Sequence, residues 1–214
     1  MFIIDFDDTL FDTHQFKITM NSALASCGVN ANDADWSYKA ARNLPDGQYA
    51  YSHVRRAEFL ATRGYDAGAV VNALENITSV ESLQTHLLPG AREFLETTKA
   101  LGQPMILLSL GDPNFQELKV YGTEIDKYFD RLFMVPEKKE EVIAELLAHH
   151  SPTEYWLVND KVDETKKIAQ HFPEIRVALK RSSRIALADY EESGYQHFET
   201  LGEIQNYILE KYGK

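Results

Sequence analysis

The chain carries short, largely apolar runs that each predict a buried strand. They are Phe2–Ile4, Met105–Leu108, Leu132–Val135, Tyr155–Val158 and Arg176–Leu179. Continuous apolarity, rather than alternation, is typical of a parallel strand covered on both faces. Between the runs, apolar residues at helical spacing predict helices over residues 91–101, 140–149, 165–172 and 201–212. Strands that alternate with helices indicate an α/β fold with a doubly wound, Rossmann-like parallel sheet.

The segment from residue 13 to residue 87 breaks this alternation, because its apolar residues follow helical spacing and form no comparable strand-like run. Turn or cap signals at residues 30–33, 44–47 and 63–66 divide it into several helices. Leu88-Pro89-Gly90 then marks the return to the alternating pattern. We therefore expect a core made from residues 1–12 and 88–214, with an all-helical insert over residues 13–87.

Composition narrows the functional classes. The net charge of −11 comes with no basic cluster, so nucleic acid and anionic membrane surfaces are poor candidates for the principal partner. No run approaches the ~20 apolar residues that a membrane span needs. The first residues lack the basic region and apolar length of a signal peptide, and the one cysteine, Cys27, excludes an intrachain disulfide. We expect a cytoplasmic protein, and the sequence predicts no oligomeric state.

Three acids, Asp5, Asp7 and Asp8, follow the first predicted strand. In open parallel sheets, ligand sites lie beyond the carboxyl ends of the strands, and residues two apart at a strand end share a face. Carboxylates this close repel one another unless a cation compensates, and hard oxygen ligands suit Mg²⁺. A plainer interpretation is an acidic turn in which Asp8 or Thr9 caps a helix.

Two other predicted strands also end in polar groups. Ser109 follows the second strand, and the backbone N–H groups of Leu110-Gly111 after it are candidates to bind phosphate oxygens. Asp160 follows the fourth strand, with Asp163 and Glu164 beyond it.

Two lysines, Lys138 and Lys139, open the helix that leads to the fourth predicted strand. A lysine is mildly unfavourable at a helix N-terminus because of the helix dipole, and this local penalty hints at another role. Lys139 is the preferred candidate, since it lies three residues before the apolar Val142 on the same helix.

In chain order, Asp5-x-Asp7-x-Thr9, Ser109, Lys139 (or Lys138) and Asp160 resemble the four motifs of the haloacid dehalogenase superfamily. The resemblance covers the core, and the helical insert resembles that superfamily's C1-type cap. Two motifs depart from the family pattern. Asn159 stands where Gly usually precedes the motif-four Asp, and Glu164 stands where a second Asp is usual. Leu110 stands where Asn often follows motif two.

The resemblance implies a Mg²⁺-dependent phosphohydrolase that acts on a small phosphorylated metabolite. Asp5 would attack phosphorus and form a phospho-aspartate, and Asp7 would protonate the leaving oxygen and then activate water. Ser109 would bind the phosphoryl group, and Lys139 would neutralise its charge. The implied Mg²⁺ ligands are Asp5, the backbone carbonyl of Asp7, Asp160, and Glu164 (or Asp163) directly or through water.

By the same resemblance, dehalogenases of the superfamily lack the second acid, so Asp7 favours phosphoryl chemistry. A phosphomutase, which passes the phosphoryl group to a substrate hydroxyl, is a near alternative. A catalytically idle member that binds a phosphate ligand or a partner protein is another. A signalling module with a phosphorylated Asp is disfavoured, because its acceptor lies in mid-chain and it has no helical insert.

A cap over the site would exclude water and contact the substrate, and would move about linkers near residues 11–13 and 87–89. Polar candidates for substrate contact in the insert are His14, Lys17, Tyr49, Tyr51, Arg55 and Arg56. Arg55-Arg56 is the preferred pair, since one of two adjacent helical positions can face inward. The sequence does not identify the substrate.

Overall fold

The computed structural model describes residues 1–42, 51–149 and 154–212. A 6-stranded sheet has the order β3-β2-β1-β4-β5-β6, and each neighbouring pair of strands is parallel. The strands are β1 (Phe2–Ile4), β2 (Met105–Leu110), β3 (Arg131–Val135), β4 (Tyr155–Asn159), β5 (Ile175–Lys180) and β6 (His197–Phe198). The predicted α/β parallel sheet is therefore confirmed, and β6 is the strand that the apolar pattern did not indicate.

The first strand lies in the middle of the sheet, between β2 and β4. Phe2 aligns with Met105 of β2 and with Trp156 of β4, and β1 is fully buried. Just past the strand, the N–H of Asp5 donates a hydrogen bond of 2.9 Å to the carbonyl of Val158. Asp5 therefore lies at the carboxyl edge of the sheet, where the flanking strands also end.

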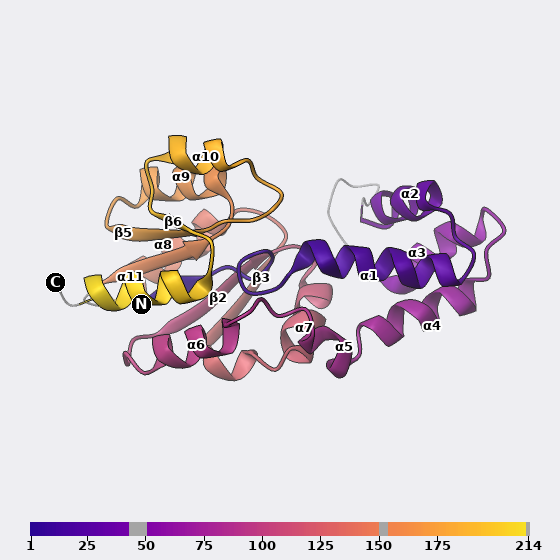
Figure 1. Cartoon of the computed structure of the whole chain (residues 1–214), viewed down its shortest axis with the longest axis horizontal. Helices are drawn as coiled ribbons and strands as arrows, with labels where there is room; N and C mark the ends of the chain where they lie inside the picture. Colours follow the sequence, from indigo (N-terminus) through magenta and orange to yellow (C-terminus); the bar gives the residue numbers. More distant parts are fainter. Residues whose placement is uncertain (43–50, 150–153, 213–214) are drawn as a thin grey trace.

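Helices cover both faces of the sheet (Figure 1). They are α6 (Ala91–Lys99), α7 (Pro113–Gly122), α8 (Lys139–His149), α9 (Val162–His171), α10 (Leu187–Ser193) and α11 (Leu201–Lys211), with a short 3-10 turn at Asp126–Tyr128. Phe2 and Ile4 share an apolar core with residues of α6 and α11, whereas Ile3 packs with residues of α8 and α9. The alternation of side chains along β1 thus builds two cores, one on each face.

The segment between β1 and β2 is helical throughout its described part and extends to one side of the sheet (Figure 1). Its helices are α1 (Thr13–Ser26), α2 (Ala31–Arg42), α3 (His53–Ala61), α4 (Ala67–Ile77) and α5 (Val80–Gln84). The turn signal at residues 44–47 lies outside the described residues. We refer to residues 13–87 as the helical segment.

The chain enters and leaves the helical segment through two stretches of backbone that lie side by side. The N–H of Asp12 donates to the carbonyl of His86, and the N–H of Leu88 donates to the carbonyl of Leu10, both at 2.8 Å. Phe11 and Leu87 form an antiparallel bridge between them. These crossings coincide with the predicted linkers. None of the helices in the described ranges has the length and apolarity to span a bilayer.

One consequence of this packing is testable at Phe94, which is fully buried in α6. Phe94→Ala should lower the free energy of unfolding by about 3–5 kcal/mol, because it removes a large apolar side chain and leaves a cavity. Urea denaturation followed by circular dichroism measures the change. Glu93→Ala, next to it on the exposed face of the helix, is the matched control and should have little effect. Equal effects of the two substitutions would contradict the assigned orientation of α6.

Candidate active site

Asp5 is buried at the end of β1, and its carboxylate is paired with a lysine. The Nζ of Lys139 lies 2.6 Å from Oδ1, and the hydroxyl of Thr9 donates to Oδ2 at 3.1 Å. Lys139 is the first residue of α8 and its side chain is 1% exposed. Lys138, by contrast, points to the surface and pairs with Glu141 at 3.0 Å. The structure therefore brings Lys139, and not Lys138, to Asp5.

A second carboxylate holds Lys139 from the other side. The Oε1 of Glu164 lies 2.8 Å from its Nζ and also accepts a hydrogen bond of 3.0 Å from the side-chain amide of Asn159. Burial alone would lower the pKa of Lys139, but Asp5 and Glu164 hold it above its ordinary value. The same ammonium outweighs burial at Glu164 and keeps the pKa of that carboxyl below its usual range. Lys139 is therefore a buried, charged group.

Asp160 lies at the end of β4, the strand next to β1, and is 1% exposed. Its Oδ1 has no hydrogen-bond partner among the described residues. Burial, and then the nearby charge of Asp5, raise the pKa of Asp160 above its ordinary value. The charges of Lys161 and Lys139 act in the opposite direction but do not outweigh burial and Asp5, so this carboxylate would be stabilised by a further cation.

The carboxylates expected to bind a metal differ in their surroundings. No group of three or more His, Cys, Asp or Glu side chains in the described part of the chain is placed to hold a metal ion alone. Asp5 and Asp160 supply two carboxylates, whereas Glu164 is occupied by Lys139 and Asp163 is exposed. This suits Mg²⁺, which keeps several waters and takes one or two carboxylates together with substrate phosphate oxygens.

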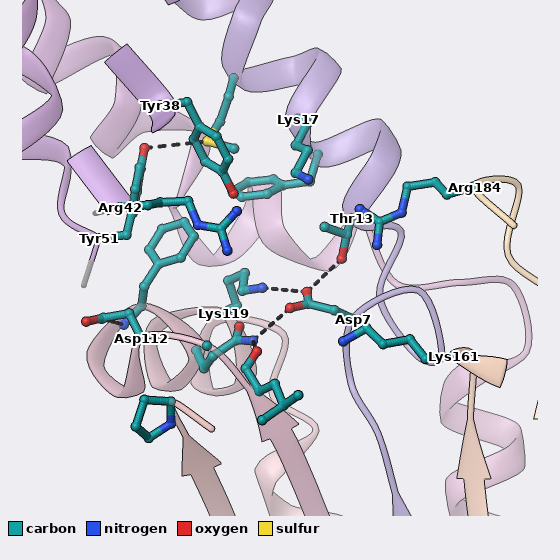
Figure 2. Close-up of a pocket in the computed structure, with 17 residues that line it drawn as sticks. Asp7, Thr13, Lys17, Tyr38, Arg42, Tyr51, Asp112, Lys119, Lys161 and Arg184 are labelled. Carbon is teal, nitrogen blue, oxygen red and sulfur yellow. Dashed lines mark hydrogen bonds and ion pairs between the residues drawn. The ribbon is translucent and has the colours of Figure 1, made fainter. Parts of the chain in front are cut away.

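Asp7 lines a cavity, where three donors hold it (Figure 2). The Nζ of Lys119 lies 2.5 Å from Oδ1, and the hydroxyl of Thr13 donates to the same atom at 2.6 Å. The side-chain amide of Gln116 donates to Oδ2 at 2.7 Å. Burial alone would raise the pKa of Asp7, but Lys119 and the two hydrogen bonds hold it well below its usual range. In this geometry Asp7 is an anion.

Ser109 is fully buried at the end of β2, and its hydroxyl accepts a hydrogen bond of 2.9 Å from the amide of Gln116. One amide group therefore connects Ser109 with Asp7. The expectation that the N–H of Gly111 binds phosphate is wrong for this geometry, since it donates to the carbonyl of Val135 at 2.9 Å. Gly111 is nevertheless required, because its φ is +150° and an added Cβ would lie 2.9 Å from the Gln116 amide nitrogen.

The third acid of the first motif, Asp8, faces another cation. Its φ is 60°, and its Oδ2 lies 2.6 Å from the guanidinium of Arg184. Arg184 comes from the loop after β5, a region that the motif pattern did not single out.

The cavity beside Asp7 has a volume of about 440 Å³ and is lined by both parts of the chain. From the helical segment it takes Thr13, Phe16, Lys17, Met20, Tyr38, Arg42 and Tyr51. Of the predicted substrate contacts, Lys17 and Tyr51 line it, whereas His14 is exposed and does not, and Tyr49 lies outside the described residues.

The preference for the pair Arg55-Arg56 is wrong, since neither residue lines this cavity. Arg56 is 1% exposed within the helical segment, where its guanidinium donates to the carbonyl of Ala34 at 3.0 Å. Arg55 lies over the ring of Phe59. One of the two adjacent arginines does face inward, but this residue, Arg56, holds the helical segment together and does not reach the cavity.

Sequence reasoning missed Gln116 and Lys119, which contact Asp7, because it predicted no helix at α7. A local signal was present, since Asp112 caps the helix by accepting from the N–H of Phe115 at 2.8 Å and Pro113 follows at the first helical position. Asp followed by Pro is a typical helix start.

The family model of the haloacid dehalogenase-like hydrolases matches residues 1–155. No curated protein matches the sequence. A haloacid dehalogenase-like hydrolase from Burkholderia xenovorans LB400, described as putative, is 18% identical with a TM-score of 0.74, and the match covers 98% of this chain and 96% of that chain.

Two further solved structures are similar in fold. A β-phosphoglucomutase from Thermotoga maritima, described as putative, is 16% identical with a TM-score of 0.66, over 98% of both chains. L-2-haloacid dehalogenase from Xanthobacter autotrophicus is 15% identical with a TM-score of 0.60, over 99% of this chain and 98% of that chain. Fold and site together define a Rossmann-like protein with a buried carboxylate at the end of its central strand. The chain belongs to the haloacid dehalogenase-like hydrolases.

Because Lys139 forms buried ion pairs and Lys138 does not, substitution of these two adjacent lysines should change the stability of the fold by very different amounts. Lys139→Met should destabilise the fold by about 3–5 kcal/mol, because it leaves Asp5 and Glu164 buried without their cation. Lys138→Met removes only an exposed pair and should change stability little. Chemical denaturation of both variants measures the difference. A Lys139 variant as stable as the Lys138 variant would contradict the buried pairing.

Proposed function

We propose that this hydrolase is a Mg²⁺-dependent phosphohydrolase that acts on a small phosphorylated metabolite through a phospho-aspartate at Asp5. The observation that carries the proposal is the pairing of buried Asp5 with Lys139, beside an Asp160 oxygen that has no hydrogen-bond partner in the described part of the chain. A carboxylate nucleophile and a phosphate are both anions, so the attack needs cations close to both groups. This arrangement provides one cation, Lys139, and ligands for another.

In the proposed reaction, Asp5 attacks phosphorus and the bond from phosphorus to the leaving oxygen breaks. Lys139 neutralises charge on the transferring group, and Glu164 positions Lys139 from its far side. Ser109, at the end of the neighbouring strand, binds the phosphoryl group. Water then attacks the phospho-aspartate and releases phosphate and free Asp5.

The residues present fit a divalent cation. Asp160 is buried, carries an oxygen without a partner among the described residues and is repelled by Asp5, so a bound cation would relieve an unfavourable arrangement. We assign its ligands to the carboxylates of Asp5 and Asp160 and the backbone carbonyl of Asp7. When bound, Mg²⁺ screens Asp5 from the phosphate and polarises the phosphoryl oxygens. A contribution from Glu164 stays a prediction.

Asp7 is the proposed acid and base. As the anion held by Lys119, it is ready to accept a proton from water in the second step. To donate a proton to the leaving oxygen in the first step, Asp7 first has to take up a proton and give up its ion pair with Lys119. Halide departure needs no proton donor, so the presence of Asp7 supports phosphoryl transfer over dehalogenation.

A cap role for the helical segment is part of the proposal. The cavity beside Asp7 has walls from the helical segment and from the core, so closure about the paired linkers at residues 11–13 and 87–89 would enclose a substrate. The alternative of a phosphomutase uses the same phospho-aspartate, and one similar fold bears that name. Steady release of phosphate separates the two, since a mutase returns the phosphoryl group to a hydroxyl.

The nucleophile is tested by Asp5→Asn, which keeps the shape of the side chain and removes its charge. Phosphate release from a generic aryl phosphate with Mg²⁺ should fall by at least about 10³-fold, because no covalent intermediate forms. Acid-stable labelling by a phosphoryl donor should disappear in parallel. Asp12→Asn, at the cap of α1, is the matched control and should retain turnover. Normal turnover by the Asp5 variant would refute the assignment, and chloride release from a 2-chloro acid would favour a dehalogenase.

The metal assignment is tested by Asp160→Asn, with Asp163→Asn as its control. Asp160→Asn should raise the Mg²⁺ concentration for half-maximal activity at least about tenfold, because it removes one of two carboxylate ligands. Asp163 is exposed in the first turn of α9, so its substitution should leave the Mg²⁺ requirement unchanged. Titration of activity with MgCl₂ gives both values. An identical metal requirement in the Asp160 variant would place the metal elsewhere.

A further inference from the structure

The cavity beside Asp7 is rich in cations although the protein is acidic overall. Its lining includes Lys17, Arg42, Lys119, Lys161 and Arg184, against the acids Asp7 and Asp112. The whole chain, in contrast, carries a net charge of −11. A local excess of positive charge in a concave site attracts an anion and raises its local concentration.

Two of these cations already have close acidic partners. Lys119 pairs with Asp7 at 2.5 Å, and Arg184 pairs with Asp8 at 2.6 Å. Lys161 lies farther from its acid, with Nζ 4.0 Å from Glu164. The described residues of the helical segment contribute the other two cations, Lys17 and Arg42, and no acid to this lining.

Lys17 is the clearest member of this group. Its partly buried side chain forms no ion pair with any acid in the described ranges, and its Nζ lies 5.6 Å from the centre of the Tyr38 ring. Arg42 approaches the same ring, with its guanidinium carbon 5.3 Å from the centre. Burial lowers the pKa of Lys17, and the charges of Arg184 and Arg42 lower it further. An anion placed here would relieve this repulsion.

Figure 2 shows Lys17 and Arg42 projecting from the helical segment, and Asp7 with Lys119 on the opposite side of the cavity. Aromatic side chains complete the wall: Phe16, Tyr38, Tyr51 and Phe115. The volume of about 440 Å³ matches a small metabolite. Because the transferring phosphoryl group would already meet Lys139 at Asp5, Lys17 is available to another part of the substrate.

We propose that the substrate is a phosphate monoester with a second anionic group, which Lys17 and Arg42 bind on the helical-segment side of the cavity. The inference rests on the proposed phosphoryl chemistry, which assigns the first phosphate to Asp5. The second group is a carboxylate or a second phosphate, since both present oxygen acceptors to a lysine and an arginine. The aromatic wall packs against the chain that joins the two anions.

The test measures binding in the Asp5→Asn protein with Mg²⁺, so that turnover does not interfere. Isothermal titration calorimetry compares propyl phosphate, 3-(phosphonooxy)propanoate and propane-1,3-diol bisphosphate, which differ only in the second group. At least one of the two-anion esters should bind about tenfold or more tightly than propyl phosphate, which is the order of a charge-assisted contact. The tighter of the two identifies the second group as a carboxylate or a phosphate.

Substitutions then show which side chains cause the preference for a two-anion ester. Lys17→Met should remove most of the preference for the two-anion ester, whereas Lys17→Arg should keep it, because the charge is retained. Lys39→Met, an exposed lysine of α2 outside the cavity, is the matched control and should keep the full preference. Equal affinity for the three esters, or a preference that survives both Lys17→Met and Arg42→Met, would overturn the inference.

Failure of this proposal and failure of the proposed function give different results. Aryl phosphate hydrolysis that depends on Asp5, together with equal affinity for the three esters, would leave the phosphohydrolase standing and remove the second anion site. A preference for two-anion esters that Lys17→Met removes, without any hydrolysis, would instead establish an anion site in a protein of another activity.

Discussion

Lys139 is a cation fully enclosed among acids, and the site is arranged around this fact. A buried ammonium is stable only when charged or polar partners replace its water, and here Asp5 and Glu164 lie within 2.6 and 2.8 Å. The count of charges is nevertheless uneven, because Asp160 adds a third carboxylate to the same pocket of the fold. Lys161 lies farther off, with its Nζ 4.0 Å from Glu164, so two lysines face three acids and the protein by itself leaves a place for additional positive charge. The parallel sheet makes this possible, since β1 and β4 end side by side and deliver Asp5 and Asp160 together.

Asp7 connects this acidic centre with the rest of the molecule. Its carboxylate binds Thr13 at the start of α1 and Lys119 and Gln116 in α7. Thr13 directly follows the paired linkers, so a rotation of α1 relative to the sheet has to alter its contact with Asp7. The position of the helical segment and the orientation of Asp7 are thus physically coupled.

The sheet could be predicted from the sequence because its signal is local. Each parallel strand is buried on both faces, so its apolarity is continuous, and the acids of the chemical motifs follow directly after it. Asp5, Asp7, Ser109 and Asp160 were found in this way. The preference for Lys139 over Lys138 rested on helical spacing, and the structure brings Lys139 to Asp5.

The helix α7 could not be predicted by the same reasoning, because its polarity is inverted. Gln116 and Lys119 are buried at the site, whereas the apolar Leu118 and Tyr121 are 42% and 53% exposed. An apolar stripe is the usual indication of a buried helix face, and here the buried face serves Asp7 and Ser109 instead. Arg56 shows the opposite error, since a charged side chain expected at the substrate is buried within the helical segment. In both cases the partner lies far away in the sequence, so no local pattern contains it.

The cavity lining and the chain as a whole differ in the sign of their net charge, and this difference resolves an apparent conflict between the overall charge and the proposed substrate. A phosphate ester approaching a protein of net charge −11 meets a repulsive field at long range. The lining of the cavity, however, contains more cations than acids, and salt screens the more distant charges within about 8–10 Å. The positive charge of the lining therefore favours anionic ligands, and the acids at the strand ends then determine which reaction such a ligand undergoes. The lining keeps this excess although Lys119 and Arg184 are paired with Asp7 and Asp8. The reason is that the described residues of the helical segment add Lys17 and Arg42 to the lining and no acid.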